Sequence, residues 1–97
     1  IDFDKVPIIP AALPYAEAGC IPGGTTRNFG AYGTEVSEMS VLQKALLCDP
    51  QTSGGLLLAV EPTGMGEVQR VAGAHGIDLH PFGTLHAAAQ EPMIIVR

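Results

Sequence analysis

The chain has 97 residues, of which 46% are apolar and 15% charged, and its formal net charge is −5. The length predicts a single domain over residues 1–97. The five basic residues are scattered and no apolar run reaches the ~18 residues of a membrane span, so we expect neither a nucleic-acid partner nor a membrane one. The charged share lies below the ~25% of an average soluble domain, which suggests that another domain or subunit covers part of the surface.

The cysteine content and the first residue indicate where the protein works. Cys20 and Cys48 are too few for a disulfide framework and form no Cys-x-x-Cys motif. No secretory leader pattern precedes them. We therefore expect a reduced, cytoplasmic protein. Because the first residue is Ile1 rather than methionine, we expect a fragment or a processed chain.

The first third of the sequence predicts an extended segment, a short helix and a long loop. Residues 1–9 are expected to be extended, with Pro7 favouring the edge of a sheet. Residues 10–19 predict a helix with Pro14 in its first turn and Gly19 in the left-handed conformation after its last turn. Residues 20–33 show no periodic pattern, and a loop of ~14 residues is long enough to be functional.

The rest of the sequence predicts two helices and three strands. Ser40 and Gln43 predict a capping box at the start of a helix that ends near Leu47 or Cys48, before Pro50. A second helix is expected to begin at Thr63, which caps it, and to end at Gly76. The strands are expected at 56–60, buried on both faces, at 77–85 and at 93–96. The predicted fold class is α+β, a small mixed sheet with packed helices.

A first candidate site lies in the glycine-rich part of the predicted loop. It contains Gly23, Gly24, Thr25, Arg27 and Asn28. Adjacent glycines allow backbone N–H groups to approach an anion, and an arginine adds a fork of donors for phosphate. The alternative interpretation is a surface turn with a solvated arginine.

A second candidate site lies between Asp49 and Gly55, where Thr52, Ser53 and Gly54 also offer hydroxyl and N–H groups. The carboxylate and amide at its start could hold a metal-bound water or orient a donor. The segment is not a P-loop, because it has no lysine and a strand is expected to follow it. The alternative is a tight turn whose glycines allow two backbones to pack closely.

The remaining polar residues do not suggest a catalytic centre. The spacing of His75, His80 and His86 matches no compact metal motif, and no nucleophile elbow is present. We therefore predict no catalytic residue and no metal ligand within this chain.

Two segments, 19–28 and 47–57, resemble the C-terminal signatures of the selenophosphate synthetases (selenide, water dikinases), and the resemblance extends over essentially the whole chain. These enzymes are similar to aminoimidazole ribonucleotide synthetase. The resemblance implies that the chain is a truncated C-terminal domain of a two-domain enzyme, with a partly ferredoxin-like α+β fold. It also implies that Asp49 should not be carried over as a metal ligand.

The resemblance further implies a reaction in which ATP, selenide and water give selenophosphate, AMP and phosphate, with Mg²⁺ neutralising the phosphates. The expected partners are the N-terminal ATP-binding domain and a second copy of the full-length enzyme. The family's nucleophile, its lysine and its metal-binding aspartates lie in other segments, so neither Cys20 nor Cys48 is the nucleophile and we expect the isolated chain to be inactive. The alternatives are a nucleotide- or phosphate-binding regulatory module and an interaction domain that completes a dimer.

Overall fold

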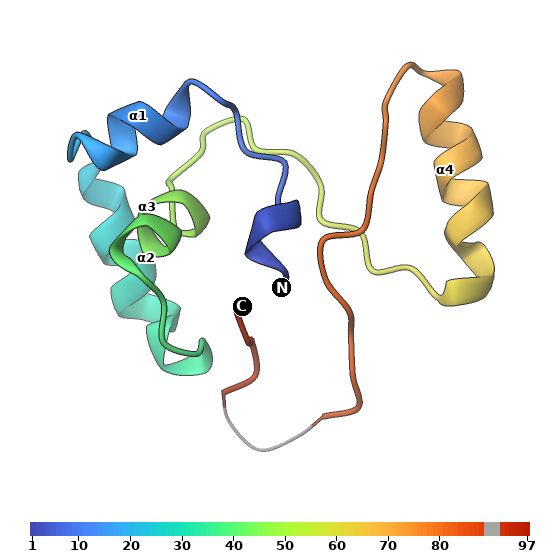
Figure 1. The fold of residues 1–97 in the computed structure, drawn as a ribbon. Helices are drawn as coiled ribbons and strands as arrows, with labels where there is room; N and C mark the ends of the chain where they lie inside the picture. Colours follow the sequence, from blue (N-terminus) through green and yellow to red (C-terminus); the bar gives the residue numbers. More distant parts are fainter. Residues whose placement is uncertain (89–91) are drawn as a thin grey trace.

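The computed structural model describes residues 1–88 and 92–97 of the chain, and all its regular elements are helical. Three helices, α1, α2 and α3, lie together, with α3 in contact with both others, whereas α4 lies apart at the end of extended segments (Figure 1). The elements are η1 (Phe3–Lys5), α1 (Ala12–Glu17), α2 (Gly23–Tyr32), η2 (Gly33–Glu35), α3 (Val41–Leu47), η3 (Pro62–Gly64) and α4 (Met65–Ala74).

Local sequence signals place the ends of three helices correctly. Pro14 lies in the first turn of α1, and Gly19, at φ +80°, follows its last turn. The N–H of Gln43 donates to Ser40 Oγ at 3.1 Å and the N–H of Ser40 donates to Gln43 Oε1 at 2.8 Å, so the predicted capping box of α3 is confirmed. Gly76 follows α4 at φ +71°, the left-handed region that favours glycine.

The predicted loop over 20–33 is wrong, because α2 occupies most of it. Pro22 is extended and leads into the helix as its N-cap. Glycine and threonine have low helix propensity, so packing against α3 must stabilise α2. Thr25 is buried, and the Nζ of Lys44 in α3 lies 3.6 Å from the centroid of the Phe29 ring.

Two further expectations about local structure are wrong. Thr63 does not cap α4, since it lies inside η3 and the helix begins at Met65 without a side-chain cap. Residues 1–9 are not simply extended, because η1 occupies their middle. In both places a short 3₁₀ helix, η1 or η3, forms where the sequence pattern did not predict one.

The predicted α+β fold with a small mixed sheet, and with it the ferredoxin-like arrangement, is contradicted. Residues 1–88 and 92–97 contain no strand, and the β pairing within them is a single parallel bridge between Val36 and Ile94. The run 56–60 was expected to be buried on both faces, yet Leu56 is 91% exposed. Apolar runs at 77–85 and 93–96 likewise form no ladder with a described neighbour. A strand requires a partner backbone, and apolar composition alone does not supply one.

The described part of the chain leaves much of its apolar surface uncovered. Its accessible surface is 7753 Å², against roughly 5,300 Å² for a compact monomer of this mass. Its radius of gyration is 14.9 Å, against about 12.5 Å for a compact domain of this length. The buried apolar side chains among the described residues are Ala45 and Val96. Large exposed ones include Ile9, Tyr15, Tyr32, Val41, Leu56, Leu57, Leu85, Met93 and Ile95.

The two ends of the chain lie side by side (Figure 1). The N–H of Phe3 donates to the carbonyl of Arg97 at 2.8 Å, and the N–H of Arg97 donates to the carbonyl of Ile1 at 3.0 Å. The N–H of Asp2 donates to the carbonyl of Phe82 at 2.8 Å, which brings residues near 82 to the same place. No helix in the described ranges is long and apolar enough to cross a membrane.

Candidate functional site

The structure brings the two candidate segments of the sequence together. Asn28, in α2, donates from Nδ2 to the carbonyl oxygen of Cys48 at 3.0 Å. Gly24, in the first turn of α2, packs so closely on Pro50 that a Cβ at that glycine would lie 2.6 Å from the proline Cγ. Helix α2 is therefore held directly against the polar segment that follows α3.

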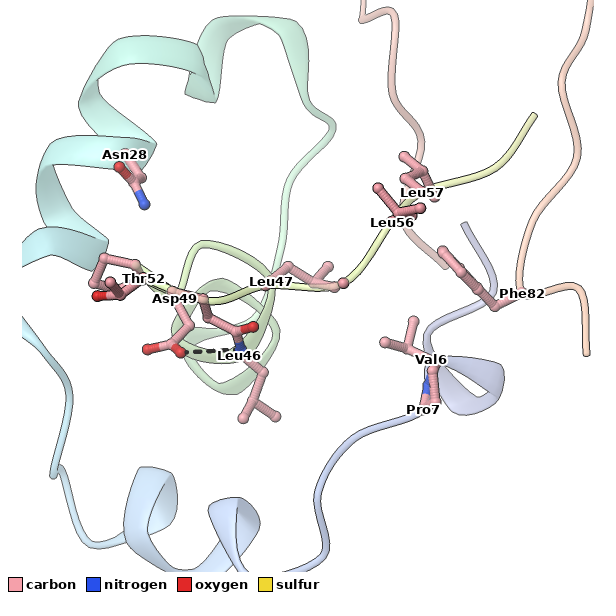
Figure 2. A pocket seen from close by; sticks show the side chains of 14 residues that line it. Val6, Pro7, Asn28, Leu46, Leu47, Asp49, Thr52, Leu56, Leu57 and Phe82 are labelled. Carbon is pink, nitrogen blue, oxygen red and sulfur yellow. Dashed lines mark hydrogen bonds between the residues drawn. The ribbon is translucent and has the colours of Figure 1, made fainter. Parts of the chain in front are cut away.

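An open groove of about 820 Å³ begins at this junction. Asn28, Asp49 and Thr52 lie toward one end of it, while Leu57 and Phe82 lie toward the other (Figure 2). The groove is therefore polar at one end and apolar at the other. The residues that line it are Val6, Pro7, Asn28, Leu46, Leu47, Asp49, Pro50, Gln51, Thr52, Gly54, Gly55, Leu56, Leu57 and Phe82.

The predicted site residues lie in different places. Asn28, Thr52, Gly54 and Gly55 line the groove, and Gly24 supports it through Pro50. Gly23, Arg27 and Ser53 are exposed and do not line it, and Thr25 is buried on a different face of α2.

Sequence reasoning missed the apolar wall of the groove. Leu56 and Leu57 were assigned to a buried strand, and Val6 and Phe82 come from segments far away in the chain. The hydrogen bond from the N–H of Asp2 to the carbonyl of Phe82 brings the last two close to each other. Periodicity describes neighbours within one element, so nothing in the sequence pattern could have indicated this contact.

Hydrogen bonds fix the side chains at the polar end. Gln51 Nε2 donates to Asp49 Oδ2 at 3.3 Å, and one amide hydrogen of Asn28 is used by the Cys48 carbonyl. Among the described residues that line the groove, Asp49 is the one with a charged side chain. Within the part of the chain that the structure describes, no three His, Cys, Asp or Glu side chains gather where they could hold a metal ion.

A smaller pocket of about 180 Å³ lies between α2 and α3. Thr25 lines it and is only 3% exposed, and its Oγ1 has no hydrogen-bond partner among the described residues. Lys44 lies over the ring of Phe29 on the same pocket, a cation–π contact that fixes the two helices relative to each other.

The N-terminus of α2 offers hydrogen-bond donors outside both pockets. The first N–H groups of a helix have no partner within it, and the helix dipole makes this end attractive to anions. Gly23 and Arg27 are exposed here, and the guanidinium forms no hydrogen bond or ion pair with another described residue. This end of α2 therefore has the electrostatic character that a phosphate group prefers.

Comparison with known proteins shows which proteins these segments are similar to. No family model matches the chain. Curated selenide, water dikinases do match. The chain is 55% identical over 85 residues to the enzyme of Photorhabdus laumondii, and the aligned segment makes up 88% of this chain and 24% of the relative. It is 50% identical over 95 residues to that of Yersinia pestis (98% and 27%) and 52% identical over 87 residues to that of Photobacterium profundum (88% and 25%).

The resemblance to the selenophosphate synthetases is therefore confirmed. The chain is similar to one segment of these selenide, water dikinases, and it spans about a quarter of the length of the curated relatives that it matches.

Proposed function

We propose that this chain is the C-terminal part of a selenide, water dikinase, which makes selenophosphate from selenide, ATP and water and releases AMP and phosphate. The observation that carries the proposal is an identity of 47–55% to curated selenide, water dikinases over 88–98% of the chain. In the full-length enzyme it works with an N-terminal ATP-binding domain, in a cytoplasmic homodimer.

In this proposal the two candidate segments support the nucleotide or phosphate site at the cleft between the domains. The exposed guanidinium of Arg27 and the free N–H groups near Gly23 and Gly24 support a phosphate-facing role for the start of α2. Thr25, Asn28 and the 52–55 segment position that helix or line the adjoining groove.

The isolated chain is inactive in this proposal. The family resemblance assigns the nucleophile, its lysine and the Mg²⁺-binding aspartates to other segments. The side chains described here do not fit a dedicated Mg²⁺ site, because Asp49 is a single carboxylate with no second acidic ligand in the groove. In this proposal those other segments hold the Mg²⁺ that neutralises the phosphates of ATP.

Selenide-dependent formation of AMP by the full-length protein tests the proposed function. Arg27→Ala should lower kcat/KM for ATP by about tenfold or more, because it removes a charge-assisted hydrogen bond to phosphate. Arg70→Ala is the matched control, since Arg70 is bound to Glu67 on the exposed face of α4 and should leave the kinetics unchanged.

Unchanged folding of both variants, measured by circular dichroism, separates a lost ligand contact from a lost fold. Wild-type kinetics in Arg27→Ala would contradict a contact with phosphate and would mean that Arg27 is a solvated surface residue. Nucleotide binding without any selenide-dependent AMP in the wild-type protein would instead favour a regulatory binding module.

A further inference from the structure

The small pocket between α2 and α3 contains a polar group that the fold leaves unsatisfied. Thr25 lines this pocket and is 3% exposed, and its Oγ1 has no hydrogen-bond partner among the described residues. A buried hydroxyl without a partner costs free energy, so such a group calls for a partner from outside the fold. A threonine in a helix adopts two χ1 rotamers, which allows this hydroxyl to turn toward a molecule in the pocket.

The other polar group of the pocket is a lysine that forms no ion pair with a described residue. Lys44, in α3, is half-buried, and its Nζ lies 3.6 Å from the centroid of the Phe29 ring. The ring face attracts the ammonium and holds it in place, but it carries no net negative charge. An ammonium has three N–H donors, so Lys44 retains donors and a positive charge for an anion in the pocket.

The rest of the lining and the size of the pocket limit what this anion can be. The other lining residues are Ile21, Thr26, Phe29, Val41 and Ala45, and all but Thr26 are apolar. The volume of about 180 Å³ is that of about six water molecules, and it lies below the roughly 300–1,000 Å³ of sites for drug-sized ligands. A nucleotide is therefore too large, and a phosphate group would leave most of its oxygens against hydrocarbon.

We propose that this pocket binds a short-chain monocarboxylate, which pairs with the ammonium of Lys44 and accepts a hydrogen bond from the hydroxyl of Thr25. One ammonium and one hydroxyl match the two oxygens of a carboxylate, and the single negative charge matches the single positive charge of the lining. The hydrocarbon tail lies against the apolar walls. The ligand links α2 to α3, which lie side by side in Figure 1. This site goes beyond the proposed function, because it is separate from the start of α2.

Calorimetric titration of the full-length protein with sodium butyrate tests the proposal. Butyrate should bind saturably and inorganic phosphate should not displace it, whereas butylammonium, with the same hydrocarbon chain and the opposite charge, should not bind. Lys44→Met keeps an apolar stem beside Phe29 and removes the charge, so it should raise the Kd for butyrate by about tenfold or more. Lys5→Met is the matched control, because it removes the same charge from an exposed side chain outside the pocket and should leave this Kd unchanged.

Thr25→Val separates a ligand contact from a structural role. Valine has a similar shape without the hydroxyl, so the variant loses an unsatisfied buried group and its thermal midpoint without ligand should be unchanged or higher. The Kd for butyrate should nevertheless rise by about fivefold, the order expected for one lost hydrogen bond. Thr63→Val, at an exposed position in η3, should leave the Kd for butyrate unchanged.

Absence of butyrate binding, or equal Kd values for the wild type, Lys44→Met and Thr25→Val, would overturn the inference. If the wild type binds no butyrate and Lys44→Met unfolds more readily, the partner of Lys44 is a carboxylate from another segment of the full-length chain, and the proposed ligand site is wrong. None of these measurements depends on selenide-dependent AMP formation, so failure here is distinct from failure of the proposed function.

Discussion

Gly24 is the residue through which α2 and the segment after α3 approach most closely. A Cβ at this position would lie 2.6 Å and 2.8 Å from the Cγ and Cβ of Pro50. A proline ring cannot swing away as a flexible side chain can, so the backbone must shift. Gly24→Ala should therefore lower the free energy of unfolding by about 1–3 kcal/mol, measured by urea denaturation.

Gly23→Ala provides the control for this prediction, because its added Cβ would meet nothing within 4 Å. Alanine has the higher helix propensity, so this variant should be unchanged or more stable by up to about 1 kcal/mol. If both substitutions alter stability equally, the close contact with Pro50 is not what requires glycine at position 24.

Among individual residues, the sequence predicted only part of the groove lining. Asn28, Thr52 and Gly54 were recognisable because small polar residues between apolar elements are typical of ligand-facing segments. Leu57 and Phe82 were not, because an exposed apolar side chain in the wall of a groove has the same sequence pattern as a buried one in a core.

Among the elements, α3 depends on its capping box. Ser40→Ala removes the acceptor for the N–H of Gln43 and leaves that donor without its partner. The variant should lose about 1 kcal/mol of stability, seen as a lower thermal midpoint. Because α3 carries Lys44, the loss should also loosen the contact with Phe29.

Ser53→Ala is the matched control for the capping box. Ser53 is exposed and its side chain makes no hydrogen bond with another described residue. This variant should unfold at the wild-type temperature. Equal midpoints for the two alanine variants would show that the capping box contributes no measurable stability.

The helix ends could be predicted and the sheet could not, for a physical reason. A cap such as Ser40 or a C-terminal glycine such as Gly76 acts within four residues of its partner, so the signal is local. A strand such as the one expected at 56–60 needs a backbone supplied from elsewhere, and local composition does not reveal whether that backbone is present. Helix α2 was not predicted, because its residues have weak helix propensity and the contact between Phe29 and Lys44 of α3, which stabilises the helix, is not visible in the local sequence.

At the scale of the whole molecule, the low charge content and the exposed apolar side chains agree with each other. The described chain has roughly 2,400 Å² more accessible surface than a compact monomer of its mass. The curated relatives are about four times as long as the segment they share with it. The expectation that another domain or subunit covers part of this surface, which rests on the low charge content, is consistent with these exposed apolar side chains.

Asp2 joins the two ends of the molecule and makes its stability depend on pH. Its carboxylate accepts from Lys5 Nζ at 2.9 Å and from Arg97 Nε at 3.0 Å. These hydrogen bonds, the one from Lys5 first, lower the pKa of Asp2 below its ordinary value of 3.8. Since the folded state favours the charged form, the contribution is fully present above pH 3.8 and is lost as the pH falls through the lower folded pKa.

Asp2→Asn should therefore lower the thermal midpoint at pH 7 but match the wild type once the pH is below the folded pKa of Asp2. Asp4→Asn, an exposed neighbour without an ion pair among the described residues, should not reproduce this convergence. The Lys5 and Arg97 side chains are 62% and 68% exposed, so ~1 M salt, with a Debye length of about 3 Å, should narrow the gap at pH 7. A gap that persists at low pH would mean that Asp2 acts through packing and not through its charge.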